Sequence, residues 1–310
     1  MPMLDYLRQI SEKTKSDELR WMLTDPSEAA SDARRWVEAG LCALSDEKRK
    51  RVAERLSKGD TAQTEATLCE LVTMVLLAYL GADPIWEPEL SGKTPDFRVT
   101  FGDTVALGDV LQVSSPMRTI CEHGDGLMES HDAGDRAQKI SEPIQAKVQR
   151  YDKLGFPLVF VLFLGDTKLL NDRHVEDALY GWSVSELSSG LLTKQLNDRK
   201  GGLGGLGGLL LPMEGSDRPS ARSLSAVLVC HWFDSLNAKR PGKRLYARAL
   251  HHFDPIVPLP PEALGYLPQV TWTAEEDGWR HSAVHNEPRV ARLTSDFELE
   301  WGISTASCPW

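Results

Sequence analysis

Apolar residues recur at helical spacing in the segment 61–80, "TAQTEATLCELVTMVLLAYL". They form a wide stripe along one side and the segment stops at Gly81, which predicts a long helix with one buried face. Two shorter, highly charged segments precede it, 27–44 and 45–58, and each begins at a serine that can cap a helix. Residues 1–60 are therefore predicted to form an N-terminal helical segment, and none of them is a candidate for chemistry.

Strand patterns dominate the next part of the chain. The stretch 91–116, "SGKTPDFRVTFGDTVALGDVLQVSSP", reads as two strands joined by a turn, and 156–164, "FPLVFVLFL", has the length of a buried strand. A helical pattern over 134–155 lies between them, with Pro143 as a kink or a break. The order helix, strand, strand, helix, strand predicts an α/β fold with a mixed central sheet flanked by helices.

The pattern divides the chain into three parts: the N-terminal helical segment 1–60, a core over 61–200, and a C-terminal α+β extension over 201–310 that packs on the core. The extension opens with "GGLGGLGGLLL" (201–211), which lacks the Lys-Ser/Thr of a phosphate-binding loop and is read as a flexible connector. A further buried strand is predicted over 221–233.

Composition narrows the class of protein. The 310 residues carry a formal net charge of -10, which does not favour a protein that coats nucleic acid through bulk electrostatics. The segment 239–248, "KRPGKRLYAR", leaves a local basic groove open, although a solvated loop and strand edge is the favoured interpretation. No apolar run has the length of a membrane span and the N-terminus has no signal core, so a cytoplasmic protein without membrane contact is expected.

Candidate chemistry gathers in the predicted core. Glu70 lies beside the buried face of the first core helix, Asp96 directly precedes the first strand, and Gln112 stands inside the second. Lys147 falls in the apolar stripe of the helix 134–155, so its side chain either reaches a carboxylate at the sheet or snorkels to the surface. Oxygen ligands on neighbouring strands are what Mg²⁺ requires for phosphodiester hydrolysis.

This layout resembles the PD-(D/E)xK nuclease superfamily, which has the restriction-endonuclease-like fold. The resemblance covers residues 61–182 and is carried by Glu70, "GKTPDF" with Asp96, "LQVSSP", the helix "IQAKVQRYDK" and the strand "FPLVFVLF". It implies a restriction-endonuclease-like core and hydrolysis of phosphodiester bonds that depends on Mg²⁺ (or Mn²⁺), with nucleic acid as the partner and DNA favoured over RNA. Many enzymes of this fold act as dimers, so a homodimer is left open.

The resemblance also implies roles for individual residues. Asp96, Gln112 and Glu70 would bind the metal ion. Lys147 would orient and deprotonate the attacking water, because relatives in the superfamily can carry the catalytic lysine on this helix.

Two positions depart from the family pattern. Gln112 stands where the family has an acidic residue, and Ser114 stands where it has a lysine. A glutamine carbonyl can bind Mg²⁺ but brings no negative charge, and a serine hydroxyl is too weak a base to replace an ammonium group. Ser114 and Lys93 are assigned to substrate contact instead. Two alternatives therefore stay open: a catalytically inactive relative that binds nucleic acid or a protein partner, and an interaction protein whose motif is a coincidence.

The other acidic residues near these motifs receive lesser roles. Asp109 precedes Gln112 by three residues and is expected on the opposite face of a regular strand, which makes it a poor substitute unless a bulge intervenes. Glu65 is expected to be solvated, and a structural role is favoured for Glu87 over a place at the entrance of a cleft. The loop 117–135, rich in His, Gly and Asp, is interpreted as a mobile cover over the cleft rather than a metal cluster.

Overall fold

The computed structural model describes residues 3–90, 92–113, 133–151, 153–164, 175, 178–180, 185–186, 192–193, 209–210, 221–234, 243–265, 267–275, 278–284, 289–293 and 299–303. Ser114, most of the loop predicted over 117–135 and most of the glycine-rich segment lie outside these residues. None of the described helices is long and apolar enough to cross a membrane.

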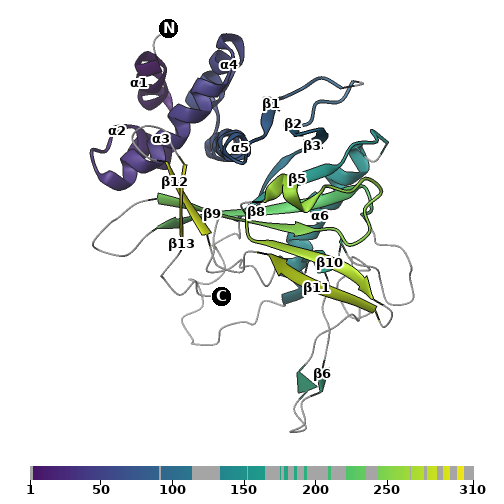
Figure 1. Ribbon diagram of the computed structural model, residues 1–310. Coiled ribbons are helices and arrows are strands. Elements are labelled where there is room, and N and C mark those ends of the chain that lie inside the picture. The colour runs from purple at the N-terminus through teal and green to yellow at the C-terminus, as the bar shows by residue number, and fades with distance from the viewer. Residues whose placement is uncertain are drawn as a thin grey trace.

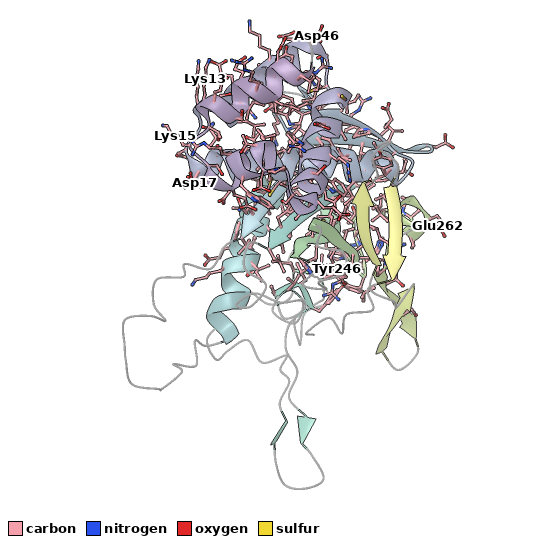
Figure 2. The ribbon with its side chains drawn as sticks, turned by 90° about the vertical axis from the view of Figure 1, so that its left-hand side faces the viewer. Lys13, Lys15, Asp17, Asp46, Tyr246 and Glu262 are labelled. Carbon is pink, nitrogen blue, oxygen red and sulfur yellow. The ribbon has the colours of Figure 1, made fainter. Side chains whose placement is uncertain are left out.

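The N-terminal part of the chain forms a layer of helices (Figure 1). Its members are α1 (Met3–Lys13), α2 (Asp17–Thr24), α3 (Glu28–Ala43), α4 (Asp46–Lys58) and α5 (Thr61–Tyr79). Ser16, Ser27 and Asp60 cap α2, α3 and α5, each by accepting a hydrogen bond from a backbone N–H of the first turn. Figure 2 shows Lys13, Lys15 and Asp17 along the outer side of this layer, with Tyr246 of the sheet below it.

One large mixed sheet follows. It contains β1 (Asp83–Trp86), β2 (Phe97–Phe101), β3 (Thr104–Gly108), β4 (Val110–Val113), β5 (Leu158–Leu164), β8 (Leu224–Asp234), β9 (Lys243–His251), β10 (Gln269–Glu275), β11 (Gly278–Val284), β12 (Arg289–Leu293) and β13 (Leu299–Ile303). The strand order is β1-β2-β3-β5-β8-β9-β10-β11, with β4 also beside β5 and β12 beside β9. β1, β2 and β3 are antiparallel neighbours, whereas β3, β4 and β8 each run parallel to β5. The predicted α/β class with a mixed central sheet is confirmed.

The sheet is covered on both faces, as β5 illustrates. All seven residues of β5 are buried. Val159, Val161 and Phe163 pack in the core shared with α1–α5, whereas Phe160 and Leu162 pack in a second core with α6 (Ala133–Tyr151). This alternation explains why the strand reads as an unbroken apolar run in the sequence.

The C-terminal part continues the same sheet. β8 to β13 extend it beyond β5, and the remaining described elements are the short β6 (Ser185–Glu186), β7 (Leu192–Thr193) and the 3-10 helix η2 (Pro261–Leu264). The solvated strand edge predicted for 239–248 is wrong for residues 243–248, because they belong to β9, which pairs with β8 on one side and with β10 and β12 on the other. The domain boundaries at residues 60 and 200 stay predictions.

The second strand of the predicted hairpin is split in two. β3 ends at Gly108 and β4 begins at Val110, so Asp109 lies at the break. Gly108 is tightly enclosed: a Cβ atom added to it would lie 1.9 Å from the Val159 carbonyl oxygen and 2.3 Å from the Phe97 ring. The chain therefore approaches β5 closely where it passes from β3 to β4, and this junction positions the candidate site.

Candidate functional site

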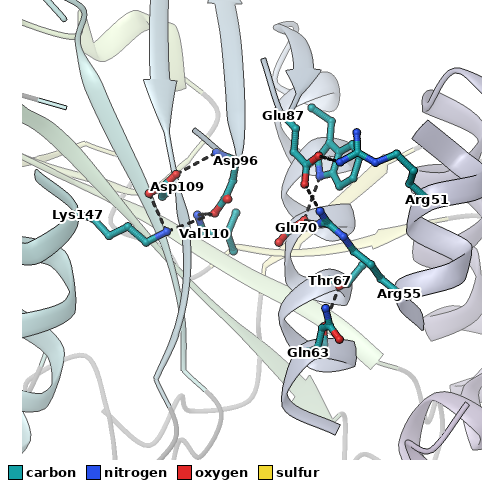
Figure 3. A network of polar contacts seen from close by, with 11 residues as sticks. Arg51, Arg55, Gln63, Thr67, Glu70, Glu87, Asp96, Asp109, Val110 and Lys147 are labelled. Carbon is teal, nitrogen blue, oxygen red and sulfur yellow. Dashed lines mark hydrogen bonds and ion pairs between the residues drawn. The ribbon is translucent and has the colours of Figure 1, made fainter. Parts of the chain in front are cut away.

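Asp96 and Asp109 join the start of β2 to the β3–β4 break. The Asp96 backbone N–H donates a hydrogen bond to Asp109 Oδ1 at 2.9 Å, and the Val110 N–H donates to Asp96 Oδ2 at 2.8 Å (Figure 3). Each of the two carboxylates thus accepts a hydrogen bond from a backbone N–H: Asp109 from Asp96 itself, and Asp96 from Val110, the residue after Asp109. Asp109 is fully buried, whereas a quarter of the Asp96 side chain is exposed.

Lys147 brings a positive charge to this pair from α6. Its Nζ lies 2.8 Å from Asp109 Oδ2 and 4.0 Å from Asp96 Oδ2. One turn further along α6, the Tyr151 hydroxyl donates to Asp109 Oδ1 at 3.2 Å. Burial, together with the Asp109 charge, raises the pKa of Tyr151 to about 12, so the hydroxyl keeps its proton. Of the two placements that the sequence left open for Lys147, a contact with a carboxylate and a side chain that snorkels to the surface, the structure has the first.

Asp109 corrects the sequence interpretation. A regular strand would turn its side chain away from Gln112, and on that ground it was a poor substitute for a site residue. The side chain does lie on the face opposite Gln112, since Asp109 contacts Lys147 and Tyr151 of α6 whereas Gln112 contacts Glu65 of α5. What is wrong is the conclusion drawn from it, because the α6 face is the one on which Asp109 meets Asp96 and Lys147.

Gln112 makes a different contact from the predicted one. Its side-chain amide donates to Glu65 Oε2 of α5 at 2.9 Å, so Glu65 is not simply solvated. Lys93, assigned to substrate, donates a hydrogen bond to the Arg150 carbonyl oxygen of α6. The assignment of Ser114 lies outside the described residues.

Glu70 lies across from Asp96 on α5. It accepts a hydrogen bond from Trp86 Nε1 at 3.0 Å, and Arg55 Nη1 lies 3.6 Å from the same oxygen. Burial, strengthened by the nearby Asp96 charge, raises the pKa of Glu70 to about 7. Burial and the Asp109 charge likewise raise the pKa of Asp96 to about 6, against the opposing effect of Lys147.

Two arginines of α4 complete the polar network. Arg51 and Arg55 contact the two carboxylate oxygens of Glu87 at 2.7 and 2.5 Å, and their guanidinium carbons lie 5.6 and 5.0 Å from the centre of a Trp86 ring. Glu87 has a φ of 42°, and it is the only non-glycine residue with a positive φ in the described part of the chain. Its backbone N–H donates to the Asp96 carbonyl oxygen at 2.9 Å.

The sequence interpretation missed this contribution because it found no chemistry in residues 1–60. The i, i+4 spacing of Arg51 and Arg55 places both on one side of α4, and that was the available signal. Their partner, Glu87, is distant in the sequence and could not be identified from spacing.

The donor set does not fit a bound Mg²⁺ or Mn²⁺ ion as it is arranged. Among the described residues, no group of three or more His, Cys, Asp or Glu side chains could hold a metal ion. Of the three predicted metal ligands, Asp96 accepts the Val110 N–H, Glu70 accepts Trp86 Nε1, and Gln112 bonds to Glu65. The ammonium group of Lys147 lies against Asp96 and Asp109 and faces the carboxylate oxygens that a Mg²⁺ or Mn²⁺ ion would need as ligands.

Comparisons with protein-family models, curated proteins and solved structures give no match to this chain. The resemblance to the PD-(D/E)xK superfamily therefore stays a prediction that rests on the motifs and on the order of the elements.

The raised pKa of Glu70 predicts an unusual pH dependence of stability. The folded carboxyl binds its proton more tightly than the unfolded one, whose ordinary pKa is 4.5, so this stabilising effect is complete below about pH 4.5 and is lost as the pH rises through about 7. We expect Glu70→Gln to remove about 2 kcal/mol of this pH-dependent stability, measured by urea unfolding across that range. The exposed Glu89→Gln is the matched control, and equal slopes for Glu70→Gln and wild type would contradict the prediction.

Proposed function

We propose that this chain is a protein of the PD-(D/E)xK type, with a restriction-endonuclease-like core, that binds nucleic acid without metal-dependent cleavage. The order α5, β1 to β4, α6, β5 supports the core, since it follows the layout on which the sequence resemblance rests. The observation that carries the proposal is the ammonium of Lys147 against the carboxylates of Asp96 and Asp109. The site has Asp96 with a lysine beside it, as the resemblance implies, but both aspartates find their cation within the chain.

Nucleic acid is favoured as the partner because α4 lines the site with basic side chains. Lys48 donates to the Trp86 carbonyl oxygen, and the partly exposed Arg55 and the half-exposed Arg51 lie over the Trp86 ring. Lys50 is exposed on the same helix. A local basic helix next to the site allows phosphate contacts despite the acidic net charge of the chain.

Binding is tested with a fluorescent DNA duplex in EDTA, followed by anisotropy at several salt concentrations. Wild type is expected to bind DNA more tightly than RNA, with affinity falling as salt rises. Arg51→Gln should weaken binding several-fold and lower the salt slope by about one. Lys15→Gln, an equal charge change in the α1–α2 turn, is the control. No DNA binding by wild type, or equal losses in the two variants, would refute the proposal.

An active Mg²⁺- or Mn²⁺-dependent nuclease is the second candidate. It is favoured by the repulsion among the carboxylates of the site: after burial, the Asp96 charge raises the pKa of Glu70 and the Asp109 charge raises the pKa of Asp96, and a bound cation would relieve both effects. Calorimetry of metal binding and plasmid nicking on the same samples, for wild type and Asp96→Ala, separates the two candidates. Metal binding and nicking that both disappear in Asp96→Ala would establish the active enzyme and exclude the inactive one.

A further inference from the structure

We infer that the Lys147 ammonium is the resident cation of the Asp96–Asp109 pair, and that its removal would convert the pair into a site for a divalent metal ion. The inference rests on the proposed function only in taking this cluster as the descendant of a nuclease site. Its physical basis is the charge balance and the geometry of three side chains, one directly before β2, one at the β3–β4 break and one from α6.

Asp109 needs a cation more than any other acidic residue of the cluster. Its side chain is fully buried, and a buried carboxylate without compensation is strongly unfavourable. Oδ1 accepts the Asp96 N–H and the Tyr151 hydroxyl, whereas the ammonium of Lys147 lies 2.8 Å from Oδ2. The hydrogen bonds therefore satisfy one oxygen and the lysine charge satisfies the other.

The same ammonium also serves Asp96. It lies 4.0 Å from Asp96 Oδ2, so one positive charge faces one oxygen from each of two carboxylates. Two carboxylate oxygens that face a common cation are the start of a Mg²⁺ or Mn²⁺ site. Here that position is filled from within the chain, because Lys147 belongs to the apolar stripe of α6, one turn from the buried Ile144 on one side and from Tyr151 on the other.

Gln112 belongs to a separate contact on the other face of the sheet. Its neighbours Leu111 and Val113 pack on the α6 side, and the Gln112 amide donates to Glu65 Oε2 of α5 at 2.9 Å. A glutamine can donate this hydrogen bond, whereas an acidic residue at 112 would face a second carboxylate. The charge balance of the Asp96–Asp109 pair therefore depends on Lys147 and not on the residue at 112.

The test uses the full chain and Mn²⁺ as the probe, with thermal unfolding and calorimetry as readouts. Wild type is expected to show no change in melting temperature between EDTA and millimolar Mn²⁺. Lys147→Ala removes the ammonium and opens space beside both carboxylates, so its melting temperature should rise by several degrees with Mn²⁺, and its Mn²⁺ affinity should exceed that of wild type by at least about tenfold. Lys139→Ala on the exposed side of α6 should behave as wild type.

Two further variants keep the test decisive. In Lys147→Ala/Asp109→Asn the gain of Mn²⁺ binding should disappear, because the buried carboxylate is gone. If Lys147→Ala is unfolded in EDTA, recovery of its native tryptophan fluorescence in Mn²⁺ supports the inference; Lys147→Gln, which keeps the side-chain volume, replaces it if recovery fails. No Mn²⁺ effect on a folded Lys147→Gln would then overturn the inference.

The outcomes for the inference and for the proposed function are distinct. Mn²⁺ binding by wild type that Asp109→Asn abolishes would overturn the inference, whatever the result with DNA. A gain of Mn²⁺ binding in Lys147→Ala together with no DNA binding by wild type would support the inference and refute the proposed function.

Discussion

Replacing Lys147 by methionine is expected to lower the free energy of unfolding by about 3 kcal/mol, because it leaves a buried charge without its partner. Methionine keeps the packing of the lysine stem against the apolar stripe of α6, so the loss reports on the charge. The Asp109 carboxylate is fully buried, so water cannot replace the lysine as its partner. The Lys147 side chain is 27% exposed, and for that reason we expect a loss at the lower end of the range for a broken buried ion pair. Urea unfolding near neutral pH measures the change as a shift in midpoint at constant m-value.

A double-mutant cycle assigns this loss to the pair. Asp109→Asn keeps an acceptor oxygen for the Asp96 N–H and removes the charge, so Lys147→Met/Asp109→Asn should be more stable than Lys147→Met alone. Lys139→Met on the same helix, where the lysine is exposed, should change stability by less than about 0.5 kcal/mol. A loss for Lys147→Met as small as that of Lys139→Met would show that the buried ion pair does not form in solution.

The elements that sequence predicts best are those with a complete local signal. The helix predicted over 61–80 is α5, Thr61–Tyr79, and the strand predicted over 156–164 is β5, Leu158–Leu164. An amphipathic stripe that ends at a glycine, and an apolar run of strand length, each specify their element without help from distant residues. Lys147 was placed correctly for the same reason, since helical periodicity alone decides which side of α6 faces the sheet.

The role of Asp109 could not be derived in this way, although the face on which its side chain lies could. Strand alternation correctly places it opposite Gln112, but which face carries the site depends on the contacts of Asp109 with Lys147 and Tyr151. These contacts join the β3–β4 break to a helix whose position relative to the sheet cannot be read from spacing. The same limit applies to Glu87, whose partners Arg51 and Arg55 belong to a helix that is far away in sequence.

These long-range contacts also change the place of the N-terminal helices in the molecule. α4 reaches Asp96 through a short chain of contacts: Arg51 and Arg55 hold the Glu87 carboxylate, and the Glu87 N–H holds the Asp96 carbonyl oxygen. Glu87 adopts a backbone conformation that costs a non-glycine residue about 1 kcal/mol or more, and such residues persist where the surroundings fix them. The helical segment thus supports the site rather than being appended to the core.

Gly108→Ala is the second substitution for which we expect a large effect, a loss of about 3 kcal/mol or more in the free energy of unfolding. The added Cβ would lie 1.9 Å from a backbone oxygen of Val159 and 2.3 Å from the Phe97 ring, and neither is the flexible end of a side chain. β3 and β5 must separate to admit the methyl group, and Asp109, the next residue, must move with them. We therefore expect the loss of stability to be accompanied by weaker coupling between Asp109 and Lys147 in the double-mutant cycle.

Gly102→Ala, in the turn of the same hairpin, separates crowding from backbone strain. Gly102 has a φ of 54°, but a Cβ atom there would meet no described atom within 4 Å, so alanine should cost only about 1 kcal/mol. The free energies of unfolding that Gly108→Ala and Gly102→Ala lose, measured by urea unfolding, test by their ratio whether the β3–β4 junction is closely packed around Gly108. Equal losses for the two alanine variants would mean that the junction has room for a side chain, which would contradict the close approach of Gly108 to β5.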